Sequence, residues 1–198
     1  MFPLLGTLEH SLVNFNFSSN PLNDSSASKL VNLLLSKPTR LVTLNLSSID
    51  GMIEFATSLG HAFSERRCPH LTSLDVSRNS LCRPGCAALC SGFLSGHVPL
   101  LSSLHLSACN LTADGLRALA QAMRGGAFPS LRDIDLAANN AGEGMVLLAT
   151  VLRAGACKKL RKIDVANNVA PGEKAGGVMR AFKDEYFVKV MKLEVVTA

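Results

Sequence analysis

The stretch "LTSLDVSRNSL", Leu71 to Leu81, carries the pattern that decides the fold of this chain. Its apolar residues fall at offsets 0, 3, 5 and 10 from Leu71, and an asparagine stands at offset 8. Offsets 3 and 5 alternate with polar offsets 2, 4 and 6, which is the period of a strand and not of a helix. The stretch therefore predicts a short strand with one apolar face, followed by a turn at the asparagine.

The same spacing recurs in phase along the whole chain. Successive copies begin 29 or 30 residues apart, and such a regular period indicates a repeat array. The other copies are "LVNFNFSSNPL" from Leu12, "LVTLNLSSIDG" from Leu41, "LSSLHLSACNL" from Leu101, "LRDIDLAANNA" from Leu131, "LRKIDVANNVA" from Leu160 and "VMKLEVVTA" from Val190.

A helix is predicted after each strand. In the fourth repeat, Leu116, Leu119 and Met123 recur at spacings of three and four, which gives a helix one apolar face. Thr112 or Asp114 is expected to cap its first turn. A strand and a helix in every repeat predict a parallel sheet with helices on one side. Because helices are roughly 10 Å wide and strands are about 4.8 Å apart, the stack should curve with its strands on the concave side.

The array is expected to form one continuous domain over residues 1–198, with about six full repeats and a truncated seventh. Terminal repeats of such arrays normally carry a polar cap. Here the first ten residues are largely apolar, and the chain ends at "LEVVTA" without a charged covering segment. We therefore expect a segment of a longer array, whose ends are covered by further repeats or by another chain.

This pattern resembles the leucine-rich repeat family, and its ribonuclease-inhibitor-like subclass in particular. The period and the helical segments "GCAALCSGF" (85–93) and "GLRALAQAM" (115–123) carry the resemblance. It implies an α/β solenoid that forms a segment of a horseshoe. Ile49 departs from the family's asparagine or cysteine at the turn, so an irregular turn is expected there. The predicted structural turn residues, whose side chains should satisfy buried backbone groups, are Asn20, Asn79, Cys109, Asn139 and Asn168.

The polar offsets project from the concave face, and the C-terminal half of that face is predicted to be acidic. Asp133, Asp135, Asp164 and Glu194 should form a row flanked by lysines. Such a strip suits a protein partner with a basic surface, and the alternative is that these are ordinary solvated residues. The face lacks aromatic anchors, so a partner could instead use the helices or loops. The candidate partner-binding residues are Asp75, Arg78, His105, Asp133, Asp135, Lys162, Asp164, Lys192 and Glu194.

Composition argues against several other kinds of protein. The net charge of +5 is spread along the chain without a long basic tail, so no nucleic-acid partner is expected. No apolar run approaches the ~20 residues that cross a bilayer, and "MFPLLGTLEH" has no basic start typical of a secretory signal. The cluster "KKLRK" (158–162) could touch acidic lipid or phosphate, but Leu160 belongs to the predicted core, so a solvated junction is favoured. We expect a cytoplasmic chain with peripheral membrane contact at most.

Catalytic and metal sites are not predicted. Cys82, Cys86 and Cys90 share one face of a predicted helix, but cysteine at such positions is more often a small buried residue than a ligand. Cys109 and His105 should point to opposite faces of the sheet, so they do not form a nucleophile and base pair. Phosphate-binding and hydrolase motifs are absent. The chain is therefore predicted to be no enzyme and to need no cofactor.

A non-catalytic scaffold for protein interactions is the favoured function. "LVTLNLSS", "LTSLDVSRNSL" and "LSSLHLSACNL" resemble the repeats of the CARMIL linkers of actin capping protein, which implies a role in the actin cytoskeleton. One alternative is a GTPase-activating protein of the Ran type, which uses a similar repeat. Another is the sensor repeats of a nucleotide-binding immune receptor.

Overall fold

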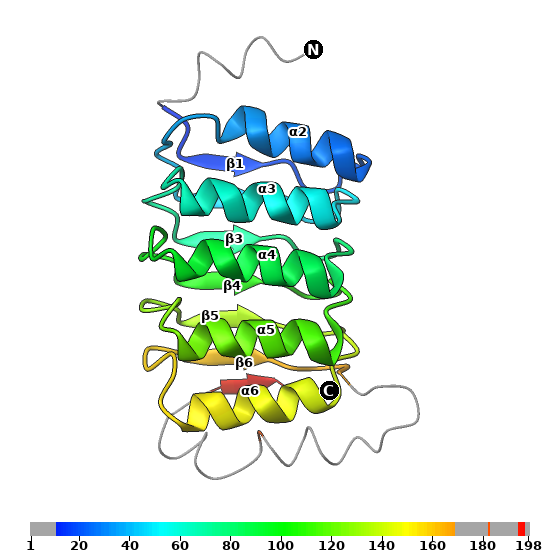
Figure 1. Cartoon of the computed structure of the whole chain (residues 1–198), viewed down its shortest axis with the longest axis vertical. Helices are drawn as coiled ribbons and strands as arrows, with labels where there is room; N and C mark the ends of the chain where they lie inside the picture. Colours follow the sequence, from blue (N-terminus) through cyan, green and yellow to red (C-terminus); the bar gives the residue numbers. More distant parts are fainter. Residues whose placement is uncertain (1–10, 169–181, 183–193, 197–198) are drawn as a thin grey trace.

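The computed structural model describes residues 11–168, 182 and 194–196 and shows strands alternating with helices along the chain (Figure 1). Each strand is only three residues long, because each repeat contributes one short extended segment before it turns toward its helix. The elements in chain order are β1 (Asn14–Asn16), α2 (Asp24–Leu34), β2 (Thr43–Asn45), α3 (Ile53–Ser64), β3 (Ser73–Asp75), α4 (Cys82–Leu94), β4 (Ser103–His105), α5 (Thr112–Arg124), β5 (Asp133–Asp135), α6 (Glu143–Arg153), β6 (Lys162–Asp164) and β7 (Glu194–Val196).

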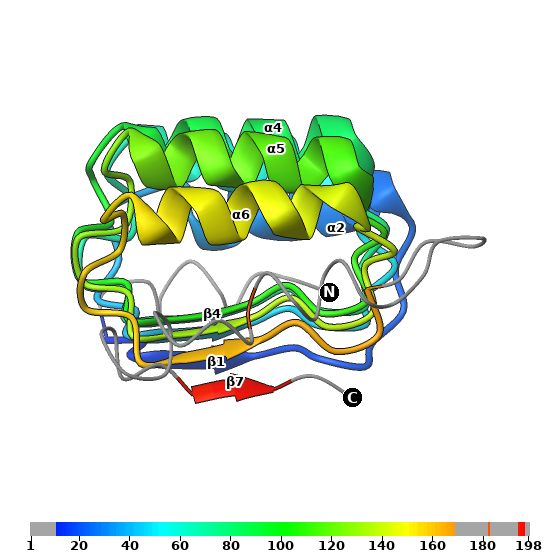
Figure 2. The same cartoon turned by 90° about the horizontal axis from the view of Figure 1, so that it is seen from below.

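The seven strands form one parallel sheet in chain order, and the helices form a second layer on one side of it. Figure 2 shows that β4 and α4 in the middle are displaced toward the helix side relative to β1, β7 and α2. The outer face of the sheet is therefore concave, and the helix layer is convex. The predicted α/β solenoid with strands on the concave side is confirmed.

The register of the sheet stacks equivalent residues of the repeats directly on one another. Leu44, Leu74, Leu104 and Ile134 are consecutive partners across β2 to β5, and all four are nearly or fully buried. They face the helices, whose buried leucines and phenylalanines complete the core between the two layers. Burying this apolar row contributes about 1.5–3 kcal/mol per side chain.

The seventh repeat differs from its predicted frame. Ile163 pairs with Val195 and Lys162 with Glu194, so β7 is displaced by two residues from the frame that begins at Val190. A displacement of two keeps every side chain on its predicted face, so the alternation in the sequence does not reveal it. Glu194 consequently lies beside Lys162, whereas the frame that begins at Val190 places it opposite Asp164.

The predicted turn asparagines connect neighbouring repeats. The Asn139 side chain is fully buried, and its Oδ1 accepts hydrogen bonds from the amides of Cys109 (2.9 Å) and Leu111 (3.3 Å) in the preceding repeat. Its Nδ2 donates to the carbonyls of Leu106 (2.8 Å) and Leu136 (2.9 Å). Asparagine supplies both donor and acceptor here, so one side chain satisfies the backbone of two turns.

An ordered turn occurs at Ile49, where the sequence predicts an irregular one. The φ angles of Ser48 and Asp50 are 54° and 58°, close to the 56° and 51° of residues 138 and 140 in the fifth repeat. The Ile49 amide donates to Oδ1 of Asn79 (3.2 Å), which belongs to the following repeat. The shape of this turn is therefore set by Asn79 of the next repeat, and the side chain at the turn position itself can be apolar.

The two remaining turn residues are variations on this arrangement. Sγ of Cys109 lies 3.3 Å from the carbonyl oxygen of Val76, so the thiol takes over the donor function of asparagine. Asn20 is exposed and donates only within its own turn, to the carbonyls of Phe17 and Ser18. In the described part of the chain, Asn20 has no turn of a preceding repeat beside it.

Helix capping also differs from the prediction. Neither Thr112 nor Asp114 caps α5, which starts without a side-chain cap. The amides of Leu111 and Thr112 instead donate to the side chain and the carbonyl of Asn139 in the next repeat. Asp24 acts similarly from the repeat before α3, because its carboxylate accepts the amides of Met52, Glu54 and Phe55 at 2.7–3.0 Å. Stacking between repeats thus supplies the caps that the local sequence lacks.

Candidate concave interaction face

The strands display their polar side chains on the concave outer face of the sheet. Pairing in register places Asp75 beside His105, His105 beside Asp135, and Asp135 beside Asp164. All four residues are half-buried, and Asp133 lies on the same face next to Ser103. The structure therefore brings together the predicted residues of β3 to β6.

Most of these carboxylates also accept a hydrogen bond from the backbone and so stabilise a turn. Oδ1 of Asp75, Asp135 and Asp164 accepts the amide two residues further on, at 2.9, 3.0 and 2.9 Å respectively. Asn16 and Asn45 make the same bond at equivalent positions of the first two repeats. An Asx turn of this kind ends β1, β2, β3, β5 and β6. The sequence signal for it is an aspartate or asparagine two residues before a serine or alanine.

His105 replaces the Asx residue in the fourth repeat. Its Nε2 lies 2.9 Å from the Ser103 hydroxyl, and its Nδ1 lies 4.0 Å from a carboxylate oxygen of Asp135. Interaction with Asp135 is the largest cause that raises the pKa of His105, burial opposes it, and the charges of Asp75 and Asp133 add to it. The imidazole therefore carries positive charge at a higher pH than usual, in the middle of a group of carboxylates.

The Asp135 carboxylate is held in its charged form by the same neighbours. Burial alone would raise the pKa of Asp135, but the interactions with His105, the Ala137 amide and Ser107 outweigh it and lower the pKa. Charge at the centre of the face thus depends on the protonation of His105, whose pKa the neighbouring Asp135 raises.

Lys162 and Glu194 form an ion pair at the edge of the acidic group. Nζ of Lys162 lies 3.0 Å from a carboxylate oxygen of Glu194 on β7. This contact raises the pKa of Lys162, with smaller contributions from Asp164 and Asp133. We define the acidic strip as the remaining carboxylates of the described face, which are Asp75, Asp133, Asp135 and Asp164.

Two predicted residues do not join this strip. Arg78 lies in the turn after β3, where it lines a hollow of about 420 Å³ together with Asp50, Met52 and Ser80. That hollow lies at the edge of the sheet where the strands end and the chain turns toward the following helices. Lys192 lies outside the described residues.

The N-terminal half of the face forms a hollow with mainly uncharged lining residues, most of which the sequence-based site does not include. Its volume is about 360 Å³, and it extends as far as Asp75 and His105, so it is continuous with the acidic strip. Short polar side chains leave this space open. Its other lining residues are Asn14, Phe15, Asn16, Thr43, Leu44, Asn45 and Ser73.

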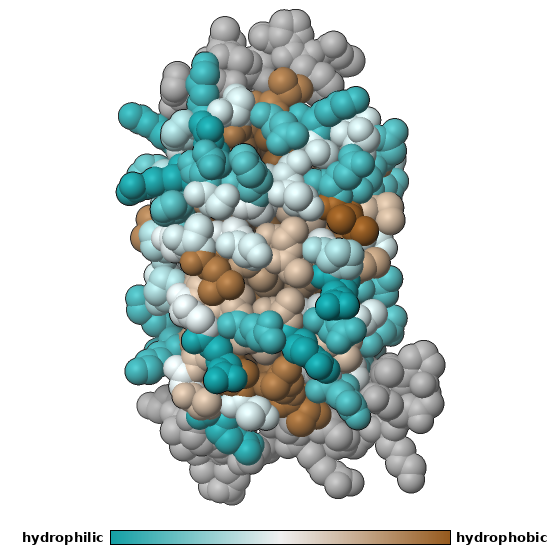
Figure 3. Space-filling view, in the orientation of Figure 1, coloured by the Kyte–Doolittle hydropathy of each residue, from teal (hydrophilic) through white to brown (hydrophobic). Residues whose placement is uncertain are grey.

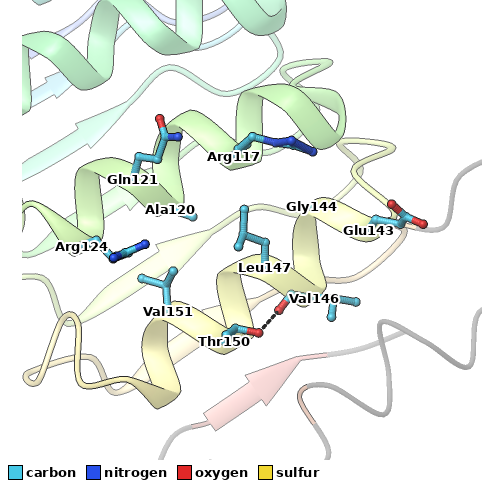
Figure 4. Close-up of a pocket in the computed structure, with 10 residues that line it drawn as sticks. All are labelled: Arg117, Ala120, Gln121, Arg124, Glu143, Gly144, Val146, Leu147, Thr150 and Val151. Atoms are coloured by element: carbon cyan, nitrogen blue, oxygen red, sulfur yellow. Dashed lines mark hydrogen bonds between the residues drawn. The ribbon is translucent and has the colours of Figure 1, made fainter.

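A second recess lies on the convex side, between α5 and α6 (Figure 4). It measures about 660 Å³. Arg117 and Arg124 of α5 stand along it, and Leu147 and Val151 of α6 supply an apolar wall. The helix layer therefore offers a surface of different chemistry from the concave face.

The described residues include no group of three or more metal-ligating side chains and no helix that is long and apolar enough to cross a membrane. Burial raises the pKa values of Cys68, Cys109 and Cys157 to about 12. A thiol with so high a pKa holds its proton at neutral pH and is not a nucleophile.

Comparison with known proteins identifies the repeat unit. Residues 67–90 and 99–120 match the family described as Leucine Rich repeat, and these segments contain β3 and β4 with most of α4 and α5. A comparison with curated proteins found no match. Repeats of this kind generally present concave binding surfaces to other proteins and suggest an interaction scaffold. The matched units continue in register along one parallel sheet, so the fold is an α/β leucine-rich repeat solenoid.

Proposed function

We propose that the chain is a non-catalytic scaffold whose acidic strip binds a basic segment of a protein partner. The observation that carries this proposal is the strip itself, with four carboxylates on one concave face from β3, β5 and β6. Among the described strands, Lys162 is the only lysine or arginine on that face, and it is paired with Glu194.

The geometry of the strip favours an extended cationic ligand. Neighbouring strands are about 4.8 Å apart, so the carboxylates of successive repeats repel one another unless a cation lies between them. His105 supplies part of the positive charge between the carboxylates, but it loses that charge as the pH rises. Lysine or arginine side chains of a partner would take the same positions, and the hollow beside Asp75 leaves room for the rest of its chain.

Charge-neutralising variants test the proposal without breaking the turns. Asp75→Asn/Asp135→Asn/Asp164→Asn removes three charges and keeps the oxygen that accepts each Asx-turn bond, as Asn16 and Asn45 already do. A matched control, Asp50→Asn/Asp114→Asn/Glu143→Gln, removes three charges outside the concave face.

Binding of a fluorescent oligolysine peptide at low salt, followed by anisotropy, measures the effect. The wild type should bind, and the concave variant should bind about tenfold more weakly, which corresponds to roughly 0.5 kcal/mol for each charge removed. The control should stay within about twofold of the wild type. Equal weakening in both variants, or no binding by the wild type, would show that the strip is an ordinary solvated surface.

Finer assignments rest on resemblance and are proposals of the same kind. The CARMIL-like repeats support a role in the actin cytoskeleton of the cytoplasm, which affinity purification with mass spectrometry would test through the partners recovered. Acceleration of GTP hydrolysis by Ran in a single-turnover assay would replace the scaffold with the Ran-type alternative. Recovery of immune-receptor components would favour the sensor-repeat alternative.

A further inference from the structure

The loops that lead from each helix to the next strand gather along one edge of the solenoid. Because the strands are parallel and in register, the loops all open on the same side, at the left of Figure 1. We call this side the helix-to-strand edge. Its five described loops are residues 35–42, 65–72, 95–102, 125–132 and 154–161.

Basic residues are concentrated at both ends of this edge. The first two loops contribute Lys37, Arg40, Arg66 and Arg67. The last two loops, with the helix ends before them, contribute Arg124, Arg132, Arg153, Lys158, Lys159 and Arg161. All of these residues except the half-buried Arg67 are exposed, and Glu65 is the one carboxylate on the described part of the edge.

The middle of the edge is apolar. Leu94 ends α4 and Leu100 precedes β4, and they are 49% and 47% exposed. Their loop contains no lysine or arginine. Figure 3 shows brown surface toward the left of the helix face, with teal side chains above and below it. Exposure of these two leucines to water is unfavourable, so their position between two cationic clusters indicates a surface that contacts a binding partner.

Helix dipoles explain only part of this charge. Cations stabilise helix C-termini, which accounts for Arg124 and Arg153 in the last turns of α5 and α6. Arg132, Lys158 and Lys159 lie several residues beyond those turns, where the dipole has little effect. The opposite edge carries mainly acids at the helix starts, including Asp24, Glu54, Asp114 and Glu143, so the charge is separated across the molecule.

Hydrogen bonds between neighbouring loops hold the edge in place. The amide and the hydroxyl of Thr39 donate to the Arg67 carbonyl at 2.8 and 3.0 Å. A ring nitrogen of His97 lies 2.8 Å from the Ser64 carbonyl oxygen. The cationic clusters and the leucines therefore keep fixed positions relative to one another, as a binding surface requires.

We propose that the helix-to-strand edge binds the surface of membranes that contain anionic lipids. The lysines and arginines contact the headgroups, while Leu94 and Leu100 enter the interfacial region between them. The described loops expose no phenylalanine, tyrosine or tryptophan on which a base could stack, since Phe128 is buried, so single-stranded nucleic acid fits this edge less well. This inference does not depend on the acidic strip, which lies on a different face.

Vesicle co-sedimentation tests the proposal with phosphatidylcholine vesicles and with vesicles that also contain phosphatidylserine. The wild type should bind only the anionic vesicles, and added salt should weaken binding. Lys158→Glu/Lys159→Glu should reduce affinity at least about tenfold. The control Lys29→Glu/Arg83→Glu changes the net charge equally at exposed positions away from the edge and should stay within about threefold of wild type.

A third variant tests the apolar part of the edge. Leu94→Gln/Leu100→Gln keeps every charge and should weaken binding several-fold, with a smaller loss at low salt, where the cations dominate. Far-UV circular dichroism establishes that each variant is folded. Three outcomes would each overturn the proposal. The wild type could bind both kinds of vesicle equally, or the lysine variant and its control could lose the same affinity. The chain could also bind a single-stranded RNA more tightly than vesicles, with an affinity that the leucine variant does not change.

Discussion

Replacing Asn139 with alanine should be among the most damaging single changes in this protein. The substitution removes a fully buried side chain that bonds to two turns. Leu136 would keep a partner, because its carbonyl also accepts a bond from Asn168 (2.8 Å). The amides of Cys109 and Leu111 and the carbonyl of Leu106 would lose this buried partner.

The expected loss follows from these three groups. A buried polar group without a partner costs about 1–3 kcal/mol, which gives roughly 3–9 kcal/mol in total. Local relaxation and water entering the turn act against the upper part of that range. We therefore expect the free energy of unfolding to fall by about 3–5 kcal/mol.

Chemical denaturation by urea, followed by far-UV circular dichroism, measures this loss, and Asn20→Ala is the matched control. Asn20 is exposed and bonds only within its own turn, so its replacement should cost no more than about 1 kcal/mol. Asn139→Cys should be milder than Asn139→Ala, because a thiol serves as donor at Cys109. Similar midpoints for Asn139→Ala and Asn20→Ala would refute the view that buried asparagines join the repeats.

Other perturbations test the packing and the electrostatics of the array. A Cβ at Gly92 would overlap the backbone of Gly60 on α3, so Gly92→Ala should lower the free energy of unfolding by about 1–3 kcal/mol, measured by urea denaturation. Asp24→Ala should cost about 1 kcal/mol at pH 7 through loss of the α3 cap. Because the pKa of Asp24 is lowered below 3.8, wild-type and variant stabilities should converge as the pH falls through that lowered pKa. The pKa of His105 is raised above 6.5, so its contribution to the free energy of unfolding should be complete below pH 6.5 and lost as the pH rises through the raised pKa. The denaturation midpoint of His105→Gln should not show this pH dependence.

The Asx turns bear on how the acidic row should be interpreted. Asp75, Asp135 and Asp164 occupy positions where asparagine makes the same bond in Asn16 and Asn45. The turn therefore requires an oxygen acceptor but not a negative charge. The charge is the part of these residues that the fold leaves unexplained, which is why the proposed test changes the charge and keeps the oxygen.

Much of the fold was accessible from the sequence, because each repeat states the same local pattern. Alternation at offsets 2 to 6 fixes which side chains of a strand face the core, and Leu74 and Leu104 are buried as it predicts. The same alternation places Asp75, His105 and Asp135 on one face. These features depend on neighbours within a few residues, so a single sequence contains them.

Other features exist only once the repeats are stacked. The register of β7 was missed, because a shift of two residues preserves the alternation. Capping of α5 and the order of the turn at Ile49 come from asparagines about thirty residues away in the chain, Asn139 and Asn79. The helix-to-strand edge is also a product of stacking, since Arg66 and Lys159 belong to repeats far apart in sequence. The local pattern determines what each repeat is, whereas the contacts between repeats decide which residues become neighbours.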